Sequence, residues 1–364
     1  MYHRYNNSLT FLVLVFTLLA VSCTETYDSH QSDYPLAEDQ RLNGKALEWL
    51  VKDIEDGKYG EVRSLVIMRN GQLVLEEYFR DYKQDDLQSL YSITKSVLSA
   101  LFGIAMDQGY ITSLDEQIMT YFGEYEPIQN MGDWKESITI RHLLSMSAGL
   151  DWNELDVPYS DPSNIFTLWN QAEDEIQFVL DRPVIAEPGT VVNYNSGLSQ
   201  LLSIILTKAT GRSAREFAAE NLFNRLDITD WSWSALNYYV SNGGWGLSLQ
   251  PVDLVKFGQL YLQQGYWDDM QVVPEDWVAT STDSLGIMNV WTNYGYQWWR
   301  YGNRMVEAGT LDSAGVYFGS GYGGQILWII PYYNMVIAVT AANGDDYVKG
   351  ESMLWEYLLR MIEE

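Results

Sequence analysis

The sequence predicts an α/β fold of the α+β kind: one antiparallel sheet built from N- and C-terminal segments, flanked by helices and interrupted by a large, mainly helical insertion. One observation is an early hairpin, because the β-prone runs 62–69 and 72–79 are joined by Asn70-Gly71, a strong hairpin signal. Another is a pair of apolar, β-prone runs near the other end, at 324–330 and 334–341. Between these ends lie helical patterns, at 138–147, 197–210, 213–224 and 251–264.

A further helix is expected soon after the first hairpin. From Ser92 to about Gln108 apolar residues recur at helical spacing, and Gly109 supplies a stop signal. Ser92 therefore falls in the first turn, where free backbone N–H groups and the helix dipole favour a developing anion. An amphipathic helix over 347–362 is expected to close the chain. A site is expected in a cleft between the sheet and the helical insertion.

The N-terminal residues have the composition of an export signal. A short polar segment precedes an apolar stretch that is too short to span a membrane comfortably, so residues 1–22 are predicted to be a signal peptide. The string that ends at Cys23, the only cysteine in the chain, resembles a bacterial lipobox. We therefore expect a lipoprotein of the bacterial cell envelope, lipidated at Cys23 and facing the periplasm or the outside. A plain secretory peptide is the alternative.

Composition predicts one large folded unit behind this signal. Residues 23–42 are polar enough to form a flexible tether, and 43–364 form the folded domain, with a helical subdomain at about 110–290. The formal charge of −27 makes nucleic acid an improbable partner. It also disfavours adsorption on anionic lipid, so the expected membrane contact is the N-terminal lipid alone. Oligomeric state is not predicted.

The strongest chemical signal is Ser92-x-x-Lys95 at the start of a helix. Residues three apart share one helical face, which places a hydroxyl beside an amine. Lys95 can serve as a base for Ser92 if burial keeps its amine neutral near pH 7. Alone, this pattern is weak, because serine and lysine are common.

Two further elements accompany this pair. In the first, Tyr194-Asn195-Ser196 precedes a helical run; Tyr194 could act as a phenolate or a proton relay, and Ser196 could pass the proton onward. In the second, the glycine-rich run 319–325 enters a strand, where backbone N–H groups can face an oxyanion. Their alternative readings are a buried tyrosine at a corner and a plain turn.

In this order, the three elements resemble the active-site motifs of the serine β-lactamase and penicillin-binding protein superfamily, closest to its class C-like branch of esterases and 6-aminohexanoate-dimer hydrolases. The resemblance covers about residues 43–364 and implies a β-lactamase/transpeptidase-like fold. It implies Ser92 as the acylated nucleophile and Lys95 with Tyr194 as the acid/base pair. The implied oxyanion donors are the backbone N–H groups of Ser92 and Gln325, and no cofactor or metal is implied.

Two departures from that pattern bear on the substrate. Ser196 stands where the branch usually has asparagine, as it does in hydrolases of nylon oligomers. Tyr322-Gly323-Gly324 stands where Lys-Thr-Gly or His-x-Gly is usual, which removes the cation that would meet a substrate carboxylate. Arg300 or Arg304 could supply a replacement. The expected substrate is therefore a small ester, amide or peptide.

Other functions remain as alternatives. One is a β-lactamase or a D-Ala-D-Ala-type peptidase of the cell wall, and another is a catalytically weak sensor or binding module. A serine–histidine hydrolase is disfavoured, because the chain has no Gly-x-Ser-x-Gly elbow and His142, the one histidine within the expected fold, lies in an apolar helical stretch. No metal-binding histidine motif occurs, so no metal is expected.

Overall fold

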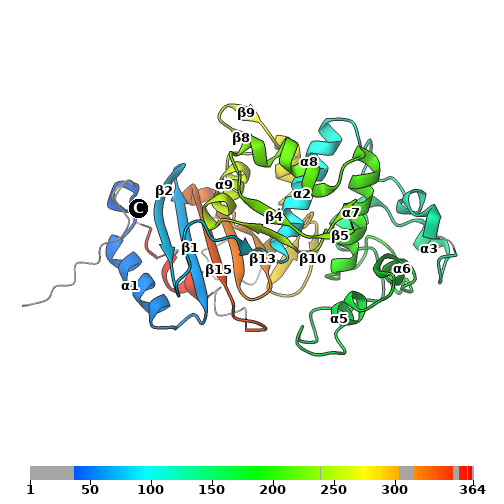
Figure 1. The fold of residues 1–364 in the computed structure, drawn as a ribbon, viewed down its shortest axis with the longest axis horizontal. Helices are drawn as coiled ribbons and strands as arrows, with labels where there is room; N and C mark the ends of the chain where they lie inside the picture. The colour runs from blue at the N-terminus through cyan, green and yellow to red at the C-terminus, as the bar shows by residue number, and fades with distance from the viewer. Residues whose placement is uncertain are drawn as a thin grey trace, which may run out of the picture.

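The computed structural model describes residues 37–125, 127–237, 239–302, 315–346, 352–358 and 360–362. Its centre is an antiparallel sheet of eight strands in the order β10-β11-β12-β13-β14-β15-β1-β2 (Figure 1). The strands are β1 (Val62–Arg69), β2 (Gln72–Tyr78), β10 (Gly286–Ile287), β11 (Thr292–Tyr294), β12 (Trp299–Tyr301), β13 (Tyr317–Gly321), β14 (Gln325–Ile330) and β15 (Met335–Ala341).

The two ends of the chain meet in this sheet. β1 pairs with β15 from Val62 opposite Ala341 to Arg69 opposite Met335, and Figure 1 shows the N-terminal strands beside the C-terminal ones. The predicted hairpin is confirmed, with Asn70 and Gly71 both in the left-handed region (φ 52° and 75°) that a two-residue hairpin turn requires. The predicted sheet of distant segments, and with it the fold class, is confirmed.

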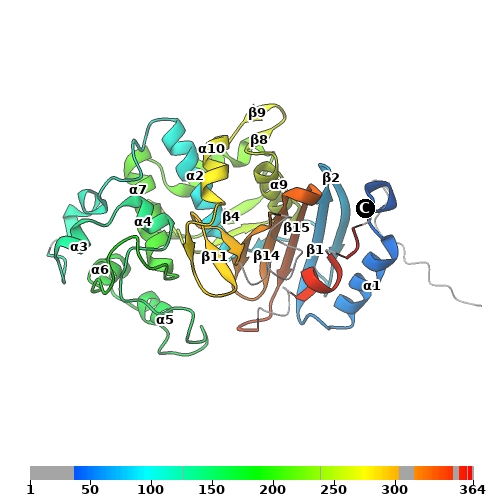
Figure 2. The same cartoon turned by 180° about the vertical axis from the view of Figure 1, so that it is seen from behind.

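Helices cover both faces of the sheet. Side chains alternate along β1, so that Leu65 and Ile67 enter one core and Val66 and Met68 the other. The first core lies under α1 (Gly44–Glu55) and a C-terminal helical turn, which are neighbours in Figure 2; the second lies under α2 and α9. These elements are α2 (Ile93–Asp107), α9 (Pro251–Leu262) and the π-helical turn η7 (Leu354–Leu358).

The middle of the chain forms the mainly helical part, drawn on the right of Figure 1. Its helices are α3 (Asp133–Glu136), α4 (Ile140–Leu144), α5 (Ile165–Asn170), α6 (Glu175–Leu180), α7 (Ser196–Thr210), α8 (Ala214–Asn221) and α10 (Glu275–Ser281). Small sheets join β3 (Gln88–Ser89) with β7 (Leu247–Leu249) and β4 (Trp231–Trp233), β5 (Ala235–Asn237) with β6 (Val240–Ser241), and β8 (Tyr266–Trp267) with β9 (Met270–Gln271). Short 3-10 turns are η2 (Ala37–Gln40), η3 (Ile118–Tyr121), η4 (Gly123–Tyr125), η5 (Phe223–Arg225) and η6 (Pro331–Tyr333).

The predicted helix α2 is confirmed and lies in the middle of the molecule. Its residues from Ile93 to Ala105 are all buried, and they include the polar side chains of Thr94, Lys95, Ser96 and Ser99. Gln297, also buried, ties it to two neighbours: its backbone carbonyl accepts from Ser96 of α2 at 2.8 Å, and its side-chain carbonyl accepts from Ser199 of α7 at 2.6 Å. Its side-chain amide donates to the carbonyl of Leu144 at the end of α4. The backbone and side chain of this one buried residue thus tie three helices together around the site.

The chain ends differ from the sequence-based boundaries. Residues 1–36, which include the signal peptide and Cys23, lie outside the described residues. Residues 37–42, assigned to the tether, instead pack on the domain: Leu42 is fully buried and forms a bridge with Ile362. Burial of this apolar side chain stabilises the packing of the segment on the domain. Of the closing helix, the described part is helical only from Ser352 to Leu358. Within the described residues, no helix combines the length and apolarity needed to cross a membrane.

Candidate active site

The predicted serine–lysine pair forms a direct contact. Ser92 is the N-cap of α2, and the Nζ atom of Lys95, one turn on, donates to its Oγ atom at 2.9 Å. A second bond runs from the same Nζ to the carbonyl of Gly244 at 2.7 Å. Tyr91, which precedes the serine, has a φ of 46°, a conformation tyrosine rarely adopts. Such strain is typical of functional sites.

Burial prepares Lys95 for a role as a base. The side chain is 1% exposed, and removal from water lowers the pKa of its amine to about 8, although the charge of Glu154 opposes the shift. Tyr194 lies alongside, with its ring centre 5.0 Å from Nζ. Burial, reinforced by Glu154, holds the pKa of Tyr194 well above its usual value, while a hydrogen bond with Ser92 acts against the shift. Tyr194 thus fits a protonated relay better than a phenolate.

Ser196 makes contacts that the sequence did not indicate. Its hydroxyl donates to Glu154 Oε1 at 2.6 Å and its backbone N–H donates to Glu154 Oε2 at 2.7 Å. The hydroxyl is thus directed at a carboxylate instead of at Ser92 or a substrate, which revises the role expected for it. Glu154 itself was missed, because it lies in a loop, 42 residues before its partner. The sequence around Glu154, which follows Trp152 and Asn153, matches no functional motif.

The glycine-rich element is also placed differently from the expectation. The turn Tyr322-Gly323-Gly324 reverses the chain, so that Gln325 lies on β14, one strand further along, with its side chain bonded to the carbonyls of Tyr322 and Ala341. The part of the element that borders the cavity beside Ser92 is Ser320 and Gly321, with Tyr322. β12 pairs with β13 only at Tyr317 and Phe318. The backbone at the end of β13 is therefore the better candidate for an oxyanion donor, in place of Gln325.

Ser92 stands at the junction of two cavities. One, of about 610 Å³, is walled by the aromatic rings of Tyr194, Trp299 and Phe318. The other, of about 410 Å³, is walled by Phe166 and Trp245. Tyr159 and Tyr322 border both cavities and meet edge to face, with ring centres 5.4 Å apart. The two tyrosines form a wall across the cleft above the serine.

These arrangements agree with a match along most of the chain: the family model described as Beta-lactamase fits residues 61–359. The chain belongs to the Beta-lactamase family. A 6-aminohexanoate-dimer hydrolase of Paenarthrobacter ureafaciens is 25% identical over 319 residues, which cover 80% of this chain and 76% of the relative.

Solved structures of this family share the fold. A putative 6-aminohexanoate-dimer hydrolase from Bacillus anthracis matches with a TM-score of 0.68 and 20% identity, covering 84% of this chain and 80% of that one. EstCE1, described as a hydrolase with promiscuous acyltransferase activity, matches with a TM-score of 0.71 and 14% identity, covering 89% and 98%. The family and its named hydrolase relative make this chain a β-lactamase-related serine hydrolase.

Among the described residues, no lysine or arginine lies in the cleft in place of the cation that the third motif lacks. Arg300 donates to the carbonyl of Thr282 at 3.3 Å and lies 3.9 Å from Asp283, and neither cavity at Ser92 has a lysine or arginine among its described lining residues. Arg304 lies outside the described residues. Nor do the described residues bring together three or more histidine, cysteine, aspartate or glutamate side chains that could hold a metal ion.

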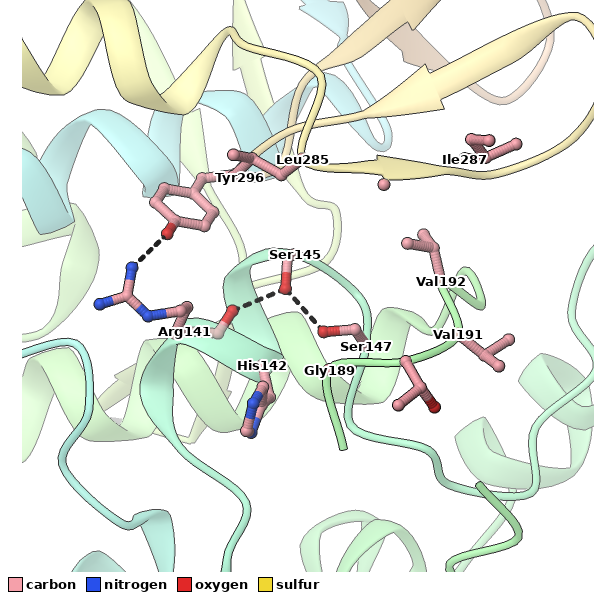
Figure 3. Close-up of a pocket in the computed structure, with 12 residues that line it drawn as sticks. Arg141, His142, Ser145, Ser147, Gly189, Val191, Val192, Leu285, Ile287 and Tyr296 are labelled. Atoms are coloured by element: carbon pink, nitrogen blue, oxygen red, sulfur yellow. Dashed lines mark hydrogen bonds between the residues drawn. The ribbon is translucent and has the colours of Figure 1, made fainter. Parts of the chain in front are cut away.

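A separate cavity of about 540 Å³ lies beside the end of α4 (Figure 3). Arg141 donates to the hydroxyl of Tyr296 there, and Ser145 bonds to Ser147. His142 also borders this cavity, with its Nδ1 atom accepting the backbone N–H of Thr139 in a capping box. Burial and the neighbouring Arg141 lower its pKa. His142 caps a helix and does not border the cavities at Ser92, so it forms no serine–histidine pair with Ser92.

Proposed function

We propose that this enzyme hydrolyses ester or small amide bonds through a covalent acyl-enzyme on Ser92. The observation that carries the proposal is the 2.9 Å contact between Lys95 Nζ and Ser92 Oγ, made by a buried lysine whose pKa is lowered to about 8. An amine that is partly neutral near physiological pH can accept the serine proton as Oγ attacks a carbonyl carbon.

The remaining steps follow from the neighbouring groups. The helix start leaves the backbone N–H of Ser92 free of intrahelical bonds, and with the backbone end of β13 it would receive the oxyanion. The protonated Lys95 returns the proton to the leaving group, with Tyr194 as the relay between them. Water activated by the same pair then releases the acyl group from Ser92.

The cleft favours substrates without a carboxylate at the reacting end. A carboxylate that meets no cation loses a charge-assisted bond of roughly 1.5–3 kcal/mol, or about ten- to a hundredfold in binding. Aromatic walls suit apolar acyl and leaving groups instead. The name of the Paenarthrobacter relative supports linear amides as one substrate class. These observations support our proposal of ester or small-amide hydrolysis over β-lactam or D-Ala-D-Ala hydrolysis.

The test compares wild type with Ser92→Ala. A fluorophosphonate probe should label only the wild type, and p-nitrophenyl esters should be hydrolysed by it alone. Absence of both reactions in the wild type would leave the sensor or binding-module alternative. A chromogenic cephalosporin is assayed in parallel, and rapid turnover of it would reject the substrate preference argued above while leaving the nucleophile in place.

We also propose that the enzyme is an envelope lipoprotein anchored through Cys23. The support is the lipobox-like string before Cys23 and the apolar stretch that precedes it. Mass spectrometry of protein from the membrane fraction should find a lipidated Cys23 at the mature N-terminus. A soluble, unmodified protein that begins further along the chain would contradict the anchor.

A further inference from the structure

Glu154 is a fully buried carboxylate beside the candidate site. It accepts four hydrogen bonds, two from Ser196, one from the indole of Trp152 at 2.9 Å and one from the hydroxyl of Tyr159 at 2.8 Å. All four donors are neutral groups. Four donors aimed at its two oxygens match the acceptor-only pattern of a carboxylate, and none of these contacts brings a cation to its negative charge.

Lys95 lies close to the groups that hold this charge. Gly244 stands between them: its carbonyl accepts from Lys95, and a Cβ atom placed on it would lie 3.6 Å from Lys95 Nζ and 3.5 Å from Ser196 Cβ. The residue whose N–H and hydroxyl bind Glu154 thus adjoins the candidate base. Both Glu154 and Lys95 are buried, and opposite charges interact more strongly in a buried setting than in water.

We propose that Glu154 is the buried counter-charge of this active site, a positioning residue that stabilises the cation formed on Lys95 when Ser92 gives up its proton. The inference rests on the proposed acyl-enzyme function. In the acylation step, the O–H bond of Ser92 breaks, the proton joins the lone pair of Lys95 Nζ, and the Oγ electron pair forms the bond to the carbonyl carbon. The step creates an oxyanion and an ammonium group. Backbone N–H groups donate hydrogen bonds to the oxyanion, and the negative charge of Glu154 stabilises the ammonium group.

The other titratable groups around Lys95 do not fill this role. Tyr194, from the segment before α7, faces the amine with its ring, and Tyr294, from β11, meets Tyr194 edge to face. Burial raises the pKa of both phenols, so both are neutral near pH 7. Glu154 is the charged group that acts on Lys95 within the described residues, and it opposes the effect of burial on the amine.

The test is the pH dependence of ester hydrolysis by Glu154→Gln. Removing the charge removes the interaction that favours the ammonium form, so the acidic limb of kcat/KM should move to lower pH than in the wild type. The plateau should fall by about ten- to a hundredfold, because the cation in the transition state loses its counter-charge. Glu154→Asp keeps the charge but, with a shorter side chain, holds it further from Ser196. The acidic limb of kcat/KM for this variant should therefore shift in the same direction, but by less.

Asp253→Asn is the matched control. Asp253 is a buried carboxylate on α9 whose partner is Lys256, and its loss should reduce stability without moving the limb. An unmoved limb in Glu154→Gln, with only a lower rate, would overturn the proposal and leave Glu154 a purely structural role. If Glu154→Gln does not fold, an unmoved limb in Glu154→Asp overturns it equally. Fluorophosphonate labelling of the wild type separates these results from failure of the proposed function, which would leave Ser92 unlabelled.

Discussion

The Nζ atom of Lys95 lies over the face of the Tyr194 ring, 5.0 Å from its centre. The electron-rich face of the ring favours the ammonium form of the lysine, whereas burial favours the free amine. In the proposed mechanism, their environments therefore give the two residues different parts of the acid/base work. Lys95 changes protonation near physiological pH, and Tyr194 remains protonated as a donor.

The rate of ester hydrolysis should follow the titration of Lys95. Because burial lowers the pKa of Lys95 from 10.5 to about 8, the amine is mostly protonated below pH 8 and mostly free above it. We expect kcat/KM to rise with pH through about 8 and then reach a plateau. Lys95→Met should lower the plateau by about a hundred- to ten-thousandfold. A pH–rate profile with a neutral p-nitrophenyl ester measures both effects.

Lys135→Met is the control for loss of a buried lysine. Lys135 is also 1% exposed and donates to the carbonyls of Gln129 and Leu180 in the helical part. Its replacement should lower the free energy of unfolding and leave the pH–rate profile of ester hydrolysis unchanged. A profile of Lys95→Met that matches that of wild type would remove Lys95 from the mechanism.

Gly244→Ala should impair catalysis by crowding the backbone of Ser196 and so displacing the Gly244 carbonyl that accepts from Lys95. The new Cβ atom would lie 3.3 Å from the carbonyl oxygen of Ser196 and 3.6 Å from Lys95 Nζ. We expect kcat to fall about tenfold, because sub-ångström displacement of a catalytic group is costly, with little change in the urea midpoint. Gly123→Ala, where a Cβ atom meets nothing within 4 Å, should behave as wild type. Equal kcat values in the two variants would contradict this account of Gly244.

Gln297→Leu should destabilise the whole domain. The substitution strips partners from Ser199 and from the carbonyl of Leu144 in a buried network. We expect a loss of about 3 kcal/mol in the free energy of unfolding. Gln263→Leu, at an exposed position after α9, should change it by less than about 0.5 kcal/mol. Urea denaturation of both variants provides the comparison, and similar midpoints would show that the network adds little.

Tyr322→Ala should widen the range of accepted substrates. Its ring meets Tyr91 and Tyr159 edge to face and closes the wall between the two cavities. Without it the cavities merge, so KM for bulky aryl esters should fall relative to KM for acetate esters. Tyr332→Ala, at a tyrosine that is 70% exposed, should alter neither value. An unchanged ratio of the two KM values in Tyr322→Ala would show that the wall does not limit substrate size.

Local signals predicted the elements whose structure is decided locally. Asn70-Gly71 sets its own hairpin through backbone conformation, and the spacing of Ser92 and Lys95 is a property of any helix. Glu154 was not predictable in this way, because Ser196, which links it to the candidate site, is 42 residues away and meets it only through tertiary packing.

The misplaced oxyanion donor has a similar cause. A glycine-rich run predicts a turn, but which arm of the hairpin borders the cavity depends on how far the neighbouring strand extends. β12 stops pairing at Phe318, which leaves the backbone at Ser320 and Gly321 beside the cavity. That length is set by strand pairing, which the resemblance of the motifs did not reveal, so the resemblance implied Gln325 instead.

The pairing of β1 with β15 has a consequence for when activity can arise. Ser64 and Thr340, whose hydroxyls bond at 2.7 Å in this pairing, are 276 residues apart. The chain loses the entropy of closing this long loop before the contacts between the two strands can stabilise it. Such a sheet is therefore slow to form. A ribosome-bound chain that lacks β13 to β15 also lacks the Tyr322 wall and the backbone edge beside Ser92. In the proposed mechanism, we therefore expect the chain to lack a working cleft throughout synthesis and to gain hydrolytic activity only after the last strand has paired with the first.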